Sequence, residues 1–168
     1  SYLDRCERAA DDMERLIDDV LTLARQGRAV GELEPVALTE LASRCRNHVD
    51  AEGFEIVVET ESVIEADPRR LGQLLENLFQ NAIDHGEPPV TVTVADTDQG
   101  FCVADDGPGI PEDRRDRVFE SGYTTSESGT GFGLAIVDGI ADAHGWETSV
   151  CESDEGGVRF EFDGVDRQ

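Results

Sequence analysis

The sequence predicts an α+β fold: a two-layer α/β sandwich whose mixed, mostly antiparallel sheet carries helices on one face, preceded by one long helix. Three observations predict it. Residues 2–27 hold apolar side chains at helical spacing, short β-rich segments follow from residue 54 onward, and further apolar helical stretches separate those segments. With 168 residues the chain is long enough for one such domain and a small appendage. We expect residues 1–28 to form the appendage and residues 34–164 the domain.

The first predicted element is a helix over residues 2–27 that packs against other helices. Its apolar residues follow in steps of three and four: Leu3, Cys6, Ala10, Met13, Ile17, Val20 and Ala24. This pattern is typical of a coiled coil or four-helix bundle. At about 1.5 Å per residue the helix is longer than a cap on a small domain requires. We therefore interpret it as one helix of a dimerisation bundle, ending near Gly27.

The first half of the domain is expected to combine a short helix with a hairpin. Thr39 is a suitable N-cap for a helix that continues to His48. Residues 54–60 are β-rich, and residues 63–66 are predicted to pair with them across a turn at Glu61 and Ser62.

The second half begins with a helix that Asp67 caps and Pro68 starts, and Gly86 ends this helix. The remaining predicted elements are strands at 90–94 and 100–104, a helix at 132–143, and a closing hairpin of residues 146–151 and 158–162. Several antiparallel strands with helices on one face complete the sandwich.

The charge of the chain restricts its partners. It carries 38 acidic residues against 14 basic ones, all of them Arg, for a net charge of −24. The acids are spread along the chain, which favours adaptation to high salt over an acidic partner-binding surface. We expect a halophilic archaeal source and no nucleic-acid partner. No apolar run is long enough for a membrane span, so we expect a cytoplasmic segment without membrane contact, compatible with an anchor upstream of Ser1.

The four cysteines, Cys6, Cys45, Cys102 and Cys151, stand apart from one another. They form no C-x-x-C pair and have no neighbouring His at metal-binding spacing. We expect them to be small buried apolar residues in a reducing compartment.

The clearest ligand-binding pattern begins at Asp105. Asp105, Gly107 and Gly109 form D-x-G-x-G directly after an apolar strand. A carboxylate beside paired glycines can hold a purine edge while the backbone comes close to the ligand. Asp, Gly and Pro also dominate ordinary turns, so the segment alone fits either a turn or a ligand site.

A second glycine run, G-x-G-x-G-L at residues 129–134, opens the last predicted helix. The N–H groups and the positive dipole end of such a helix start attract phosphate. The polar residues 120–128 before it fit either a mobile loop or a lid that closes over a ligand.

Asn77 and Asn81 lie one turn apart on a helix that is otherwise rich in Leu and Phe. Amides among apolar side chains cost free energy unless a partner binds them. Backbone groups could satisfy Asn77. Alternatively, an Asn oxygen can complete the shell of Mg²⁺, which prefers oxygen ligands.

In this order and spacing the motifs resemble the ATP-binding domain of the GHKL superfamily (the Bergerat fold), specifically that of sensor histidine kinases. The longest match is R-L-x-Q-L-L-x-N-L-x-x-N-A at residues 70–82. The resemblance implies that ATP binds with Mg²⁺, that Asn81 is the metal ligand, and that Asp105 accepts the adenine amino group. It assigns further nucleotide contacts to Gly107, Gly109, Ile110, Thr124, Thr125, Gly129, Thr130, Gly131, Phe132, Gly133 and Leu134.

The residue at position 77 separates two activities within the superfamily. By resemblance, ATP hydrolases of the gyrase type carry a water-activating Glu there, whereas this chain has Asn77. By resemblance, Asn77 and Asn81 are the catalytic residues. An amide is a poor base, so ATP hydrolysis should be slow. Slow hydrolysis suits a histidine protein kinase, which hands the γ-phosphate to a protein.

The resemblance also implies partners. The γ-phosphate would pass to a His on a first bundle helix and then to an aspartate of a response-regulator receiver domain. Residues 1–28 would be the second bundle helix, through which the full-length protein forms a homodimer. His48, His85 and His144 lie outside the acceptor motif, so we expect the first helix upstream of Ser1.

Two positions depart from the resembled pattern. Asp84 stands where many relatives carry Lys, and no Arg lies between Glu120 and Gly131. A degenerate nucleotide sensor that binds ATP without transfer therefore stays open as an alternative. An ATP hydrolase fits less well because Asn77 replaces the water-activating Glu. A serine kinase of the anti-sigma type fits less well because it has no place for the long first helix.

Overall fold

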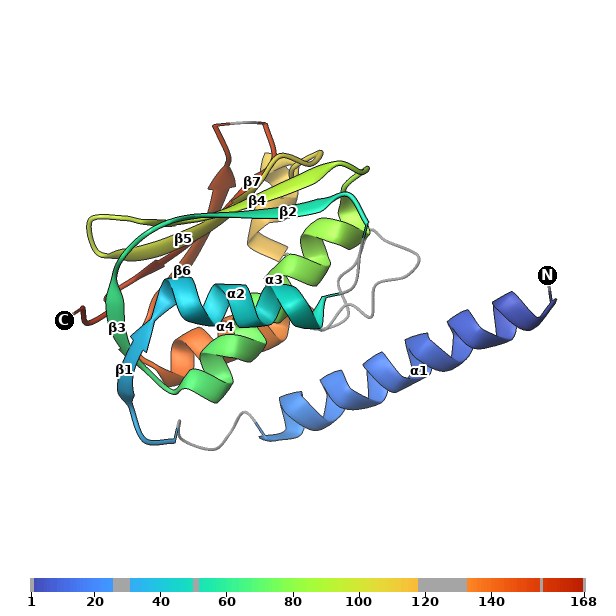
Figure 1. The fold of residues 1–168 in the computed structure, drawn as a ribbon, viewed down its shortest axis with the longest axis horizontal. Helices are drawn as coiled ribbons and strands as arrows, with labels where there is room; N and C mark the ends of the chain where they lie inside the picture. Colours follow the sequence, from blue (N-terminus) through green and yellow to red (C-terminus); the bar gives the residue numbers. More distant parts are fainter. Residues whose placement is uncertain (1, 26–30, 50–51, 118–132, 155, 168) are drawn as a thin grey trace.

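The structure is a computed structural model that describes residues 2–25, 31–49, 52–117, 133–154 and 156–167. Figure 1 shows a twisted sheet with helices α2, α3 and α4 on one of its faces, and helix α1 (Tyr2–Arg25) extending beside this domain. The predicted α+β sandwich with helices on one face is confirmed.

The main sheet has five strands in the order β2 (Phe54–Glu59), β4 (Val90–Asp96), β5 (Gly100–Asp105), β7 (Val158–Asp163) and β6 (Glu147–Glu152). β2 and β4 are parallel, and the other neighbours are antiparallel. Alternate residues of β4 (Val90, Val92 and Val94) are buried against the helices. The predicted closing hairpin is present as β6 and β7.

The predicted hairpin of residues 54–60 with 63–66 is wrong. β3 (Val63–Ala66) pairs with β1 (Glu34–Ala37) in a separate two-stranded sheet. A two-residue hairpin turn needs positive φ angles, and no non-glycine residue in the described ranges has one. Thr60 turns the chain instead: its hydroxyl donates to Asp96 (2.6 Å) and accepts from the Ser62 N–H (2.9 Å).

Three helices cover the sheet: α2 (Leu38–His48), α3 (Pro68–His85) and α4 (Gly133–Ala143). Asp67 caps α3 as predicted, because its Oδ1 accepts from the N–H groups of Arg69 and Arg70. The predicted Thr39 cap is wrong: α2 starts at Leu38, and the Thr39 hydroxyl donates to the Thr60 carbonyl at 2.8 Å. Thr39 thus ties α2 to the end of β2.

The core lies between the helices and the sheet. α3 contributes its apolar face, which consists of Leu71, Leu74, Leu75, Leu78 and Phe79. On the sheet side, Phe101 stacks on Phe162 at 4.8 Å and meets Trp146 edge-on at 5.8 Å. Each such buried side chain contributes about 1.5–3 kcal/mol to folding. This burial holds helix α3 in place, and with it the side chains on the opposite face of the helix.

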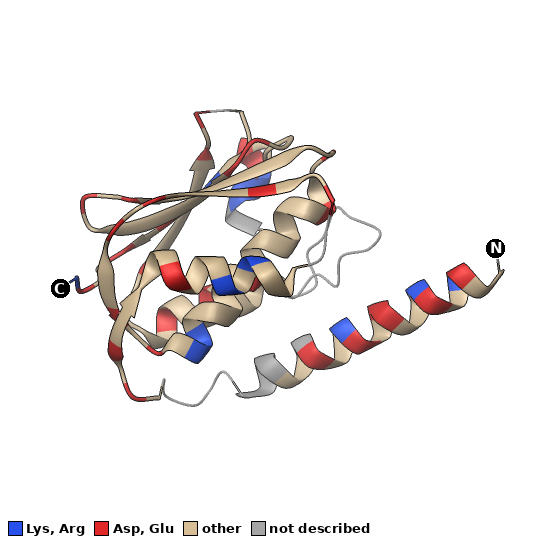
Figure 2. Cartoon of the chain, in the orientation of Figure 1, with Lys and Arg blue, Asp and Glu red and all other residues tan. Residues whose placement is uncertain are grey.

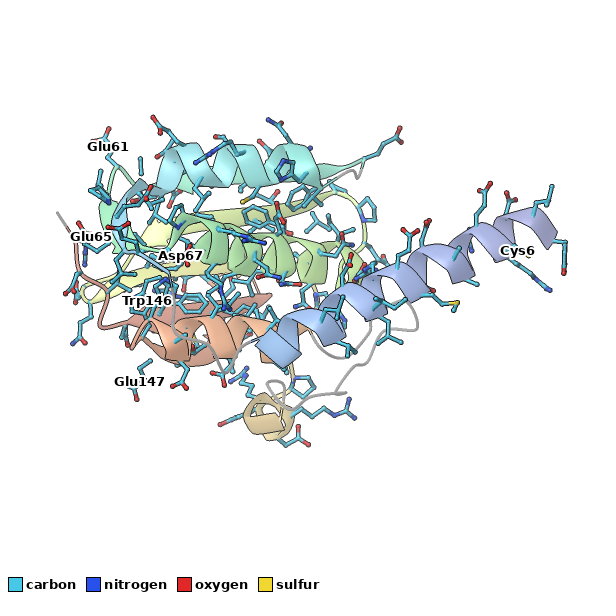
Figure 3. All side chains as sticks on the ribbon, turned by 90° about the horizontal axis from the view of Figure 1, so that it is seen from below. Cys6, Glu61, Glu65, Asp67, Trp146 and Glu147 are labelled. Atoms are coloured by element: carbon cyan, nitrogen blue, oxygen red, sulfur yellow. The ribbon has the colours of Figure 1, made fainter. Side chains whose placement is uncertain are left out.

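The cysteine prediction is confirmed for Cys45 and Cys102, which are buried, and is wrong for Cys6, which is exposed. Burial raises the pKa of the Cys45 thiol to about 12 and also raises that of Cys102, so both are poor nucleophiles. Cys6 lies on the part of α1 that extends away from the domain (Figure 3), where nothing in the described chain covers it.

Helix α1 exposes much of its apolar surface: Tyr2, Leu3, Met13, Leu16, Ile17, Val20 and Leu21. Helix α1 contacts α4, and its Arg15 forms an ion pair with Asp84 of α3. Figure 2 shows residues of both signs along α1 and acidic residues over helices, strands and turns of the domain. In the described ranges, no helix combines the length and apolarity needed to span a membrane.

Candidate functional site

Asp105 ends strand β5 and is almost buried, with 9% of its surface exposed. Its Oδ1 accepts from the N–H groups of Gly107 (2.9 Å) and Val158 (3.2 Å). Burial raises the pKa of the Asp105 carboxyl, and the two N–H bonds oppose that rise. None of the described residues donates to Oδ2. A buried acceptor oriented in this way can receive a ligand's N–H group.

Gly157 makes this geometry possible, although it is not among the residues that the resemblance assigns to the nucleotide site. A Cβ at Gly157 would overlap the carbonyl and carboxylate oxygens of Asp105. Only glycine lets β7 come this close to the end of β5. In the sequence, the sign of this close approach is the G-x-x-F segment at residues 157–160, in which the glycine directly precedes strand β7.

The loop after Asp105 lies against the C-terminal end of α3. A Cβ at Gly107 would be 3.7 Å from Cα of Gly86, the residue that caps α3. Gly109 has a φ of +76°, which favours glycine, and its position faces the Gly156 carbonyl. Ile110 packs partly buried against the core. The D-x-G-x-G segment is thus next to the helix that carries Asn77 and Asn81.

Asn77 and Asn81 lie half-buried on α3. The Asn77 amide nitrogen donates to the Gln73 carbonyl at 3.0 Å, so backbone satisfies that part of the side chain. Its Oδ1 faces α4, 3.7 Å from where a Cβ of Gly133 would lie. The amide oxygen and the first residue of α4 therefore border the same space.

Helix α4 begins at Gly133 and runs for 11 residues, with Leu134 packed partly buried against the core. Its start offers backbone N–H groups and the positive end of the helix dipole. The other predicted contacts of this glycine run and of the preceding segment lie outside the described residues: Thr124, Thr125, Gly129, Thr130, Gly131 and Phe132.

The donors present on α3 fit Mg²⁺ rather than a transition metal. The described ranges contain no group of three or more His, Cys, Asp or Glu residues arranged to hold a metal ion. Mg²⁺ needs only one or two protein oxygens, because substrate phosphates and water complete its octahedron. The Asn81 amide oxygen is such a hard donor, so the predicted Mg²⁺ role of Asn81 stays a prediction that fits the chemistry.

Comparison with known proteins matches this arrangement to a family. Residues 66–167 match the model of histidine kinase-, DNA gyrase B-, and HSP90-like ATPases. The chain is 34% identical over 164 residues to the sensor histidine kinase ZraS of Escherichia coli K12, covering 91% of this chain and 35% of that protein. It is 35% identical over 158 residues to the histidine-protein kinase AfsQ2 of Streptomyces coelicolor, covering 86% and 29%. The chain thus spans about a third of the length of these relatives.

Solved structures give the same result. The full-length ShkA structure with AMPPNP aligns with a TM-score of 0.77 and 32% identity, covering all of this chain and 39% of that one. The mycobacterial sensor histidine kinase MprB aligns with a TM-score of 0.67 and 29% identity, covering 80% and 97%. The chain belongs to the histidine kinase-, DNA gyrase B- and HSP90-like ATPase family, and within it carries the catalytic domain found in sensor histidine kinases.

Proposed function

We propose that this domain binds ATP with Mg²⁺ and transfers the γ-phosphate to a histidine of the whole protein. The observation that carries the proposal is the buried Asp105 carboxylate, fixed by two backbone N–H groups one loop away from α3. Asp105 would accept the adenine amino group, while the phosphates would lie between Asn81 and the start of α4. The nucleotide analogue AMPPNP in the similar ShkA structure supports nucleotide binding by this domain.

Asn81 and Asn77 would have separate roles. Asn81 would hold Mg²⁺, which when bound neutralises phosphate charge. Asn77 would border the phosphates through its oxygen without activating water, because an amide is not a general base at neutral pH. This favours phosphoryl transfer over hydrolysis.

The whole protein would supply the remaining parts. The exposed apolar residues of α1, such as Met13, Ile17 and Val20, have the spacing of a bundle helix. We propose that residues 1–28 pair with a first helix carrying the acceptor His, that two copies form a homodimer through these helices, and that the phosphoryl group then passes to a response-regulator aspartate. The names of the relatives, which describe sensor histidine kinases, support a histidine as the phosphate acceptor.

Labelling with γ-³²P-ATP tests the transfer. The present chain should bind ATP, turn it over slowly and remain unlabelled, because none of its three histidines lies in an acceptor motif. The full-length protein should acquire an acid-labile, base-stable phosphoryl group, and Asn81→Ala should abolish it. Rapid hydrolysis by the present chain would favour a hydrolase, and tight ATP binding without label in the full-length protein would favour a degenerate sensor.

The acidic composition supports a source that lives at high salt, although the relatives named above are bacterial. Self-repulsion at a charge of −24 falls as salt screens it, with a screening length of roughly 3 Å at 1 M. The melting temperature should therefore rise from 0.05 to 2 M KCl. A flat profile would contradict adaptation to salt and leave the proposed activity untouched.

A further inference from the structure

Asp84 is a carboxylate on the helix that carries the two asparagines, and both of its oxygens have partners. Oδ1 accepts from the Gln80 amide at 2.9 Å, and Oδ2 accepts from the Arg15 guanidinium at 3.1 Å. The Asp84 side chain is 13% exposed and that of Arg15 is 37% exposed. The pair is therefore partly shielded from solvent, and its interaction is stronger than that of a typical surface pair.

Asp84 faces the same side of α3 as the proposed phosphate-binding residues. At 100° per residue, Asn77, Asn81 and Asp84 fall within about 60° of one another around the helix axis. Asp84 follows Asn81 by three residues, which is a rise of about 4.5 Å. A negative charge thus lies within about one helical turn of the amide proposed to hold the metal.

An unneutralised carboxylate at this position would repel a triphosphate. Two like charges a few ångströms apart at the edge of a protein interact appreciably, because the local dielectric is lower than that of water. Arg15 supplies the compensating charge, and it comes from α1, outside the domain that holds the rest of the site.

We propose that Arg15 is a positioning residue for the nucleotide: by pairing with Asp84 it neutralises the carboxylate beside the phosphates and thereby makes ATP affinity depend on the docking of α1. This inference rests on the proposed ATP binding. By linkage, ATP in turn strengthens the docking of α1 against the rest of the domain. A signal that shifts α1 would then change nucleotide occupancy without touching the residues that contact the base.

A charge cycle on the present chain tests this, with affinities measured by calorimetry at 0.1 M KCl and saturating Mg²⁺. Arg15→Gln should weaken ATP binding roughly five- to tenfold, because it leaves Asp84 uncompensated. Asp84→Asn should strengthen ATP binding, and the double variant should return close to the parent value. Arg8→Gln is the matched control: it removes the same charge from α1 seven residues earlier and should change nothing.

Adenosine separates the charge effect from damage to the fold. It lacks phosphates, so all four variants should bind it like the parent chain, and in 2 M KCl the differences in ATP affinity should shrink. Equal ATP affinity of Arg15→Gln and the parent, with adenosine binding intact, would overturn the inference alone. Absence of ATP and adenosine binding in the parent chain would overturn the proposed function itself. Equal losses for ATP and adenosine in Arg15→Gln would show a purely structural role and also overturn the inference.

Discussion

At the base end of the proposed site, Asp105 is held by backbone, whereas at the phosphate end Asn77 is held by its own helix. The Asp105 carboxylate receives two N–H groups from separate segments, residues 107 and 158, and Gly157 lets those segments meet. Among the residues that the structure describes, the Asn77 side chain bonds only to its own helix, one turn back, at the Gln73 carbonyl. The geometry of the base end therefore depends on tertiary packing between distant segments. The geometry of the phosphate end depends on the spacing of residues along one helix.

The difference has a consequence for how each end tolerates change. Backbone donors cannot be replaced by mutation of a side chain, so the base end fails when its close packing is disturbed. The phosphate end combines amide oxygens, a helix start and the Arg15–Asp84 pair, so it responds to changes of charge. We expect steric variants to act mainly at the first end and charge variants mainly at the second.

Gly157→Ala should have the largest effect, because its methyl group would overlap Asp105 and force β5 and β7 apart. We expect a loss of about 1–3 kcal/mol in the free energy of unfolding, as for an overpacked core, and loss of adenosine and ATP binding together. Urea denaturation and calorimetry measure the two.

Gly72→Ala is the matched control. Its Cβ would lie 3.6 Å from Leu41, at ordinary contact distance, inside helix α3. It should leave binding intact and leave stability equal or higher by up to about 1 kcal/mol, since Ala favours helix. A well-folded Gly157→Ala variant that binds adenosine normally would remove the distinction between the two ends.

Asp105→Asn should have the next largest effect. The amide keeps the acceptor for the two N–H groups but can place a donor against the adenine amino group. Loss of a charge-assisted bond costs about 1.5–3 kcal/mol, which is roughly ten- to a hundredfold in affinity. Adenosine and ATP should lose equally, because the change lies at the base end.

The same variant should be at least as stable as the parent chain near pH 7. Burial raises the pKa of Asp105, so the carboxyl favours the folded state when protonated and this contribution is lost as the pH rises through the folded pKa. Asparagine carries no such penalty. Asp106→Asn, an exposed neighbour whose Oδ1 accepts from the Thr91 N–H, should leave affinity unchanged. A destabilised Asp105→Asn variant would indicate that the carboxylate serves the fold instead.

The sequence allowed the elements with strong local signals to be predicted. Asp67 and Pro68 mark the start of α3, Gly86 marks its end, and the apolar alternation of residues 90–94 marks β4. The pairing of β3 was missed because sequence proximity favours β2, while the partner β1 is a four-residue strand with one buried residue, Val36. Strand pairing depends on contacts between distant segments, which local patterns do not encode.

The site was predicted unevenly for the same reason. The spacing of Asn77 and Asn81 is local and could be read directly. Gly157 helps to place Asp105 only because strands β5 and β7 lie side by side. The Arg15–Asp84 pair joins residues that are 69 positions apart. Neither leaves a periodic signal in a single sequence. The Thr39 cap failed because a distant acceptor, the Thr60 carbonyl, takes its hydroxyl.

Substitution of His144 should have the smallest effect on stability. It also tests whether the far end of α3 is independent of the two ends of the proposed site. His144 lies at this far end of α3, where Nε2 accepts from the Asp67 N–H (3.0 Å) and Nδ1 donates to the Ile140 carbonyl (2.8 Å). Only the neutral ring makes both bonds. Burial lowers the pKa of His144, with Arg70 acting in the same direction and the Ile140 bond and Asp67 opposing it. The neutral ring also stacks on Trp146 at 4.2 Å, near Asp67 (Figure 3).

Because the folded state favours neutral His144, its contribution to stability is complete above the ordinary pKa of about 6.5 and falls as the pH drops below it. The stability difference between the parent chain and His144→Gln should therefore shrink from pH 7.5 to pH 5, by about 1.4 kcal/mol for each unit of pKa shift. The many carboxylates titrate in both chains and cancel in this difference. ATP affinity at pH 7.5 should be equal in the two. A pH-independent stability difference would exclude the neutral-ring account, and an altered ATP affinity would show that the far end of α3 is coupled to the site.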